Sequence, residues 1–217
     1  MKPNIRFEQK QIGTFLAALL MFAGIIVTAN CGAARPVKYY TLNPAPTPEP
    51  SVSVENSAPL PVTILVGRIN ASHLYLDSPI VYSSGGVELG TYPSHRWAEV
   101  PTEMVEAMLM QSLRSKGKFR SVARIGSSAK GDYILRGHLY ALEEVDSPSL
   151  AARFSLSLEL FQPKTGVVVW TQSYSHDEPV NHKTVSAIVE ALRQNVLAGL
   201  DQLTSSLDAY VSTRAAH

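Results

Sequence analysis

The chain has 217 residues, with 19 lysines and arginines against 18 aspartates and glutamates, and a formal net charge of +1. This balance excludes a dominant nucleic-acid-binding surface, because such a surface needs clustered basic charge. A single cysteine excludes an intramolecular disulfide, so a folded domain of this chain must be stable from packing alone.

The first 31 residues have the layout of a secretory signal. A basic head, Met1–Gln11, precedes the uncharged and mostly apolar run Ile12–Ala29, and Cys31 follows shortly after. A lone cysteine at the processing point is typical of a bacterial lipoprotein, in which the signal is cut before the cysteine and the thiol is acylated. We therefore predict a signal peptide over 1–30 and a lipid anchor at Cys31.

Two other interpretations of this region remain open. Thr28-Ala29-Asn30 is similar to the lipobox of bacterial lipoproteins at Ala29, but Thr28 and Asn30 depart from it. Residues 12–29 can also serve as an uncleaved anchor in the inner membrane, since at ~1.5 Å per residue they almost cross a ~30 Å hydrocarbon core. In the third interpretation the chain is secreted and Cys31 is an incidental thiol. All three place the folded part outside the cytoplasm, and Gly32 in place of aspartate favours the outer membrane under the proteobacterial sorting rule.

The segment 31–61 is predicted to be an anchored N-terminal stretch and tether. It contains a β-prone patch, Val37–Leu42, which can pair with a sheet. Six prolines then fall within Asn43–Pro61, and proline stiffens a chain and removes amide donors. An extended tether or surface loop is therefore expected here.

The folded domain is predicted over 62–217 and starts with strands and a helix. Val62–Val66 alternates as a strand does, and Gly85-Gly86 predicts a hairpin turn. A helix is expected to begin at Pro101, with apolar residues at three- and four-residue spacing, and to stop at Gly117.

The second half predicts a run of strands and a closing helix. Phe119–Ile125, Tyr133–Val145, Phe154–Leu160 and Val167–Tyr174 are the expected strands of an antiparallel meander. An apolar stripe predicts a long helix from about Lys183 to Tyr210. The order of elements indicates an α+β single domain, a largely antiparallel sheet with two main helices packed on one face.

The sequence contains no strong catalytic or metal-binding motif. Phosphate-loop and GxSxG patterns are absent from it. His176 and His182 lie close in sequence, but a solvated loop before the last helix is a better interpretation than a metal site. Three acidic residues cluster at a strand end: Glu143, Glu144 and Asp146. Paired carboxylates can act in acid–base catalysis, but a solvated loop at the strand exit is the better interpretation. We therefore expect no catalytic residue, no metal and no cofactor.

Five residues are candidates for a partner interface: Tyr75, Tyr82, Tyr92, Arg96 and Trp97. Aromatic residues and arginine dominate interface hot spots. For Trp97 a core position with a hydrogen-bonded indole is favoured over an interface, and for the tyrosines simple packing is an equal alternative.

Several short segments together resemble the ABC-type transport auxiliary lipoproteins. They are Lys38–Leu42, Tyr75–Tyr82, His95–Glu99, Gly117–Phe119, Asp132–Leu135 and Val169-Trp170. The resemblance covers roughly Val37 to Tyr210. The chain departs from the family at Val100-Pro101 and in the long proline segment before Val62.

This resemblance implies a non-enzymatic lipoprotein on the periplasmic face of the outer membrane. Its expected partners are a mammalian-cell-entry (MCE) domain protein and the ABC permease and ATPase of a lipid transport system, with self-association as a further expectation. The alternatives are an assembly factor or chaperone for an outer-membrane machine, a periplasmic enzyme, and a direct lipid carrier with an apolar cavity.

Overall fold

The computed structural model describes residues 36–43 and 59–215. The chain divides into two units, Met1–Pro36 and Val37–His217, and the fold below is that of the second.

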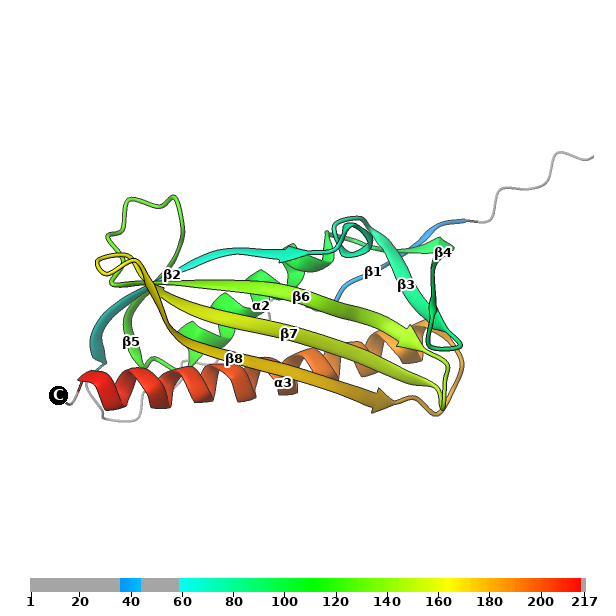
Figure 1. Ribbon diagram of the computed structural model, residues 1–217. Helices are drawn as coiled ribbons and strands as arrows, with labels where there is room; N and C mark the ends of the chain where they lie inside the picture. The colour runs from blue at the N-terminus through cyan, green and yellow to red at the C-terminus, as the bar shows by residue number, and fades with distance from the viewer. Residues whose placement is uncertain (1–35, 44–58, 216–217) are drawn as a thin grey trace, which may run out of the picture. The chain divides into compact units, whose positions relative to one another are not determined.

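Eight strands, one 3-10 helix and two α-helices follow one another along the described residues (Figure 1). They are β1 (Lys38–Tyr40), β2 (Leu60–Ala71), η1 (His73–Tyr75), β3 (Pro79–Ser84), β4 (Glu88–Trp97), α2 (Pro101–Ser115), β5 (Phe119–Arg124), β6 (Tyr133–Val145), β7 (Ala151–Gln162), β8 (Val167–Pro179) and α3 (Val185–Ala215).

All eight described strands join one mixed sheet in which β6 is central. One edge of β6 pairs with β2 over Tyr133–Leu139 and then with β3 over Glu143–Val145. The other edge of β6 pairs with β7, and β7 pairs with β8. Beyond β2 lies β5, and beyond β3 lie β4 and β1.

The α+β class is confirmed, and the strand pairing is more mixed than predicted. The long strands β6, β7 and β8 form the expected antiparallel meander, and β3 and β4 form the expected hairpin at Gly85-Gly86. However, β5 is not part of the meander, because β2 lies between β5 and β6 and pairs with both in parallel. The pairs β3–β6 and β1–β4 are parallel as well.

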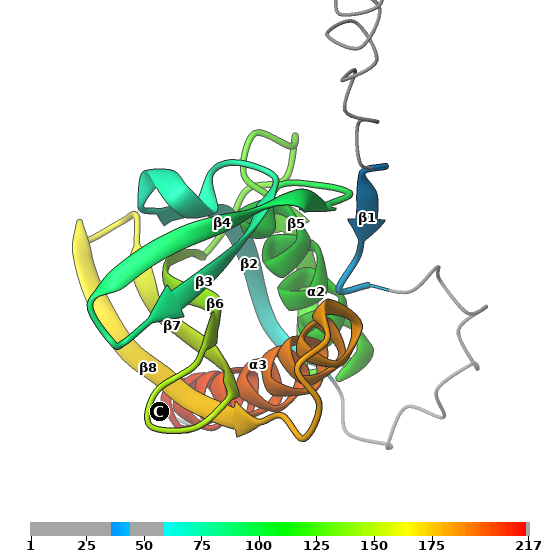
Figure 2. The ribbon, with the colours of Figure 1, turned by 90° about the vertical axis from the view of Figure 1, so that its right-hand side faces the viewer.

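Both α-helices cover the same face of the curved sheet, as predicted (Figure 2). Helix α3 packs on β7 and β8, α2 packs on β2 and β5, and the two helices contact each other. The alternating residues Phe154, Leu156, Leu158 and Leu160 of β7 are fully buried, as is Leu192 of α3. Burial of this continuous apolar face is the main stabilising contribution to the fold.

Local signals explain where the helices begin and end. Helix α2 starts at Pro101, whose fixed φ suits the first helical position, and it stops before Gly117, which has a φ of 61°. Helix α3 is preceded by Thr184, whose hydroxyl accepts the Ala187 N–H at 3.2 Å as an N-cap. The helix continues to Ala215, five residues beyond the predicted end.

Candidate functional site

The predicted anchor lies outside the described residues. Cys31 and the apolar run Ile12–Ala29 both precede residue 36, where the description starts. Among the described residues, none of the helices has the length and apolar character that crossing a membrane requires.

Two of the five predicted interface residues belong to the core. Trp97 is 1% exposed and Tyr75 is 3% exposed, so neither side chain offers a surface to a partner. The core position preferred for Trp97 is therefore confirmed. Its indole Nε1 has no hydrogen-bond partner among the described residues, which contradicts the expectation of a bonded indole.

The other three candidates are partly exposed and lie on β3 and β4. Tyr82 packs edge-on against Tyr92, with ring centroids 5.3 Å apart, and Arg96 donates from Nη1 to the Ser78 hydroxyl at 3.1 Å. A Cβ added to Gly90 would lie 2.5 Å from the Tyr82 ring, so the absent side chain at this position makes room for the tyrosine. Tyr92 in turn donates its hydroxyl to Glu144.

A bulge in β6 controls which face its carboxylates reach. Leu139 lies opposite Leu156 and Ala141 lies opposite Ser155, so Tyr140 is an extra residue in the β6–β7 ladder. Leu139, before the bulge, and Leu142, after it, are both buried in the core, although they are three residues apart and regular alternation would put them on opposite faces. The shift of phase places Glu143 beside Arg153, on the sheet face that the α-helices do not cover, and Glu144 on the opposite face.

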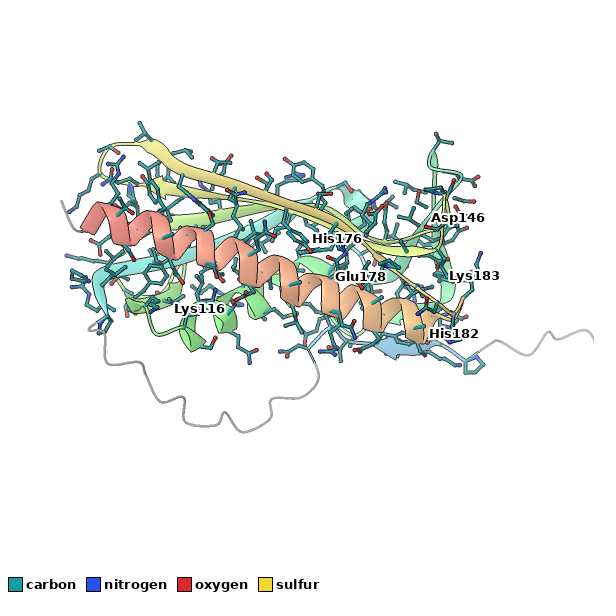
Figure 3. The ribbon with its side chains drawn as sticks, turned by 90° about the horizontal axis from the view of Figure 1, so that it is seen from below. Lys116, Asp146, His176, Glu178, His182 and Lys183 are labelled. Atoms are coloured by element: carbon teal, nitrogen blue, oxygen red, sulfur yellow. The ribbon has the colours of Figure 1, made fainter. Side chains whose placement is uncertain are left out.

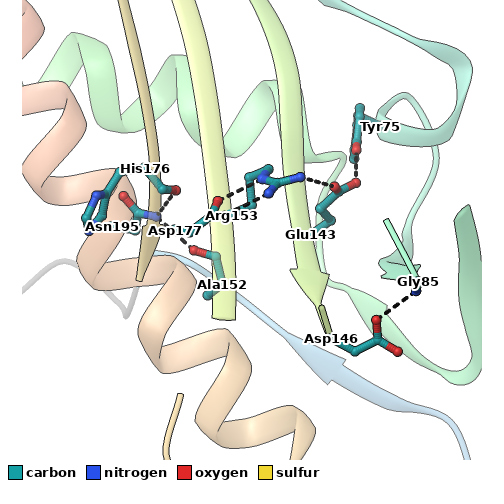
Figure 4. A network of polar contacts seen from close by, with 9 residues as sticks. All are labelled: Tyr75, Gly85, Glu143, Asp146, Ala152, Arg153, His176, Asp177 and Asn195. Carbon is teal, nitrogen blue, oxygen red and sulfur yellow. Dashed lines mark hydrogen bonds and ion pairs between the residues drawn. The ribbon is translucent and has the colours of Figure 1, made fainter. Parts of the chain in front are cut away.

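A chain of polar contacts starts at Glu143 and crosses three strands (Figure 4). The Tyr75 hydroxyl donates to Glu143 Oε2, and Arg153 Nη1 lies 3.8 Å from Glu143 Oε1. Arg153 also donates from Nε and Nη2 to the two carboxylate oxygens of Asp177, at 2.7 Å each. This bidentate arrangement is the strong form of a guanidinium–carboxylate contact.

The contacts of this network shift the pKa values of its members. Burial, followed by the hydrogen bond to Glu143, raises the pKa of Tyr75. The hydrogen bonds from Arg153 lower the pKa of Asp177, and the same bonds raise the pKa of Arg153. Tyr75 therefore keeps its proton, and the Arg153–Asp177 pair remains charged over the physiological range.

An open pocket of about 720 Å³ lies directly over this network. Its walls include Tyr140 and Leu89, which are 59% and 49% exposed. Ser155 and Ser175 also line it. The pocket therefore combines carboxylates, a guanidinium, hydroxyls and an aromatic ring, and we take it as the candidate functional site.

A buried amide holds α3 against the strands beneath this site (Figure 4). Asn195 is 1% exposed, and its Nδ2 donates to the carbonyls of Ala152 and His176 at 2.8 Å each. Its Oδ1 accepts the Tyr174 hydroxyl at 2.8 Å. Three of the four hydrogen-bonding positions of the amide are thereby used. These bonds fix the position of α3 relative to β7 and β8.

The acidic cluster at the end of β6 is not the predicted solvated exit. Glu143 and Glu144 are 4% and 3% exposed, because β6 continues to Val145 between its neighbours. Asp146 accepts the Gly85 N–H at 2.9 Å and the Ser84 hydroxyl at 3.0 Å, and these bonds lower its pKa. The sequence signal that could have revealed this is the unbroken strand pattern through Val145.

The histidines near the last helix lie apart in the structure (Figure 3). His176 belongs to β8, which extends to Pro179 and replaces the predicted loop, and its Nε2 lies 3.4 Å from Glu178. His182 is exposed in the short connection before α3. No group of three or more metal-ligating side chains occurs in the part of the chain that the structure describes.

A second pocket, of about 700 Å³, lies between the start of α2 and the strands β2 and β5. Glu106 of α2, which is 7% exposed, pairs there with Arg124 of β5 at 2.9 Å. Arg68 and Glu103 also line it. Its charges are of both signs and Glu106 is already paired, so this pocket points to no particular ligand.

Two solved structures are similar to the described fold. A crystal structure of a Xanthomonas campestris protein, assigned to family DUF330, matches with a TM-score of 0.69 and 21% identity over 82% of this chain and 99% of that one. A second crystal structure, of an uncharacterized protein, matches with a TM-score of 0.60 and 13% identity over 82% of this chain and 99% of that one. At such identities these likenesses show the fold alone.

No match was found among curated protein sequences. The family model for the ABC-type transport auxiliary lipoprotein component, in contrast, matches residues 40–204, which is most of the chain and nearly all of the described fold. The chain belongs to the family of ABC-type transport auxiliary lipoprotein components.

Proposed function

We propose that this protein is a non-enzymatic auxiliary component of an ABC/MCE-type lipid transport system, held at the periplasmic face of the outer membrane by an acylated Cys31. The observation that carries the proposal is the family match over residues 40–204. An auxiliary component leaves ATP hydrolysis to another subunit, in agreement with the absence of a phosphate-loop motif from the sequence.

The lipid anchor supports this role through membrane affinity. A single acyl chain gives only reversible membrane binding, whereas two or more chains hold a protein stably. A fully acylated Cys31 thus keeps the domain at the membrane, where it can dock the distal end of an MCE assembly.

The candidate partner surface is formed by Tyr82, Tyr92 and Arg96. All three are partly exposed, and they share the β3–β4 hairpin. Self-association of the protein through free sheet edges is a further part of the proposal, since the outer edge of β8 pairs with no described strand.

The polar lining of the described pockets disfavours a direct lipid carrier. Acyl chains need an apolar cavity, but both pockets described above are lined by charged groups such as Glu143, Arg153, Glu106 and Arg124. The contact between α3 and the strands β7 and β8 is filled by buried apolar side chains.

Affinity purification of the tagged full chain from gently solubilised membranes tests the proposal. We expect an MCE-domain protein to co-purify and the N-terminal peptide to begin at an acylated Cys31. Arg96→Ala should reduce recovery of the partner, whereas Arg136→Ala, on the helix-free face of β6, should not. Recovery of outer-membrane assembly components instead would favour the assembly-factor alternative and overturn the transport role.

A further inference from the structure

The helix-free face of β6, β7 and β8 carries polar side chains over much of its length. On β7, Arg153, Ser155 and Ser157 alternate with the buried residues that face α3. Their partners on β8 are Asp177, Ser175 and Ser173. No described α-helix covers this face, and the pocket over Glu143 and Arg153 opens on it.

The floor of the pocket has unused hydrogen-bonding capacity of both kinds. Arg153 uses Nε and Nη2 for Asp177, and Glu143 uses Oε2 for Tyr75. Arg153 Nη1 and Glu143 Oε1 are 3.8 Å apart, too far for a hydrogen bond to each other. Both residues line the pocket, Arg153 with a partly exposed side chain and Glu143 at its floor with only 4% of the residue exposed, so Arg153 Nη1 is the more accessible donor and Glu143 Oε1 is an acceptor beside it.

The formal charge of the Glu143–Arg153–Asp177 network limits the kinds of ligand that the pocket can bind. Two carboxylates and one guanidinium leave a formal charge of −1 on the network, which opposes phosphates and carboxylates. An ammonium group would satisfy Glu143 but would leave the Arg153 donor unmatched. A hydroxyl group both donates and accepts, so it matches the donor–acceptor pair and the nearby Ser155 and Ser175.

The wall of the pocket supplies an aromatic surface. Tyr140 is the bulged residue of β6, its ring lies 4.5 Å from that of His138 between centroids, and 59% of the residue is exposed. A bulge commonly re-aims a side chain beside a functional site. An exposed ring with a negative face suits the C–H groups on one side of a sugar ring.

We propose that this pocket binds a neutral sugar residue of a glycan chain. Arg153 Nη1 and Glu143 Oε1 hydrogen-bond neighbouring sugar hydroxyls, Ser155 and Ser175 contact others, and the Tyr140 ring packs on the sugar face. This inference goes beyond the proposed transport role and does not depend on it, because the binding residues belong to this chain alone.

Titration calorimetry on the purified full chain, kept in a sugar-free detergent, tests the inference. The probes are a tetramer of N-acetylglucosamine and maltotetraose, which distinguish an amino-sugar glycan from a glucan, with choline chloride and inorganic phosphate as non-sugar probes. We expect saturable binding of at least one tetrasaccharide and none of the other two probes. Tyr140→Ala should weaken sugar binding roughly fivefold to tenfold, as expected for loss of one aromatic contact.

Two further variants separate sugar binding from folding. Glu143→Gln keeps the shape of the side chain and an acceptor for Tyr75, yet it replaces the acceptor facing the sugar with an N–H donor, so binding should weaken. The unfolding midpoint of the variant, measured in parallel, should stay well above the assay temperature. Tyr39→Ala removes a similarly exposed tyrosine from β1, outside the pocket, and should leave affinity unchanged.

Three results would overturn the inference: no saturable binding of either sugar, binding that Tyr140→Ala and Glu143→Gln leave intact, or binding of choline in place of sugar. None of these results bears on whether an MCE-domain protein co-purifies, so failure here and failure of the transport role remain distinguishable.

Discussion

Glu143 and Glu144 are neighbours in the chain, but their carboxylates enter different surroundings. The Tyr140 bulge puts Glu143 on the open face with Tyr75 and Arg153, and Glu144 on the other face with Tyr92. Each buried carboxylate accepts a tyrosine hydroxyl, and burial together with that bond raises the pKa of Tyr92 as it does that of Tyr75. Buried charges persist only where such partners meet them.

Asp208 of α3 is the clearest source of pH-dependent stability. Burial raises its pKa to about 6 despite the nearby Lys116 and Lys118, and its Oδ1 has no hydrogen-bond partner among the described residues. The folded chain therefore binds more protons than the unfolded chain between the ordinary value of 3.8 and about 6. Stability from this group is fully present below pH 3.8 and is lost as pH rises through about 6.

We predict that Asp208→Asn removes the loss of stability that ionisation of Asp208 causes as pH rises. Relative to the unsubstituted protein, the variant should gain on the order of 1–3 kcal/mol in unfolding free energy between pH 4 and pH 7, the lower end reflecting solvent screening. Urea unfolding at a series of pH values measures the difference. Glu88→Gln, an exposed control on β4, should differ from the unsubstituted protein by an unfolding free energy that does not change with pH. If the difference in unfolding free energy for Asp208→Asn is also independent of pH, burial of the ionised Asp208 carboxylate does not destabilise the fold.

Asn195 joins α3 to two strands through one amide. We predict that Asn195→Ala lowers the free energy of unfolding by about 2–4 kcal/mol, since it removes both donors to Ala152 and His176 and strands the Tyr174 hydroxyl. Denaturant unfolding checks this. Gln194→Ala next to it removes only an exposed bond to Glu190 and should cost less than about 0.5 kcal/mol. Equal costs for the two variants would contradict the role of Asn195.

At the scale of elements, the approach of α3 to β8 depends on Gly199. A Cβ at this position would lie 2.7 Å from the Tyr174 ring and 2.9 Å from Phe154, closer than packed atoms can be. Gly199→Ala should gain about 1 kcal/mol of helix propensity and lose more to the clash, for a net destabilisation of about 1–3 kcal/mol.

Two further variants separate the steric effect of Gly199→Ala on stability from its effect on helix propensity. Ala198→Gly on the exposed face of α3 reports the propensity difference alone. In a Tyr174→Ala background, Gly199→Ala should cost less than in the unsubstituted protein, because a main clashing ring is gone. Thermal unfolding of the four proteins measures this coupling, and perfectly additive effects would mean that the ring does not restrict the helix.

The elements could be predicted from the sequence because their signals are local. The strand β6 has the bounds that the sequence pattern predicts, Tyr133–Val145, and α2 lies between the predicted start signal Pro101 and stop signal Gly117. The insertion of β2 between β5 and β6 joins strands distant in sequence, and no local pattern encodes it. The candidate site was missed for the same reason, since Tyr75 and Glu143 are 68 positions apart and the Tyr140 bulge shows only in the pairing register.

At the scale of the whole molecule, the proposed anchor at Cys31 would limit how far the domain can lie from a membrane. Cys31 lies seven residues before Lys38, where β1 begins, and an extended chain of that length spans at most about 25 Å. If Cys31 is acylated, the domain would therefore stay within reach of the membrane surface. Within the domain, β1 pairs with β4, with Tyr40 opposite Trp97.

We predict that the mature protein begins at an acylated Cys31 and that Cys31→Ser accumulates as a longer, unprocessed precursor, because acylation precedes signal removal in lipoprotein maturation. Gel mobility of the two proteins, with mass spectrometry of the N-terminal peptide, measures this. If the wild-type chain is already full-length, residues 12–29 serve as an uncleaved span. If it is cut but carries no lipid and leaves the membrane fraction, Cys31 is an incidental thiol and the domain acts free in its compartment, which removes the basis for docking at the outer membrane.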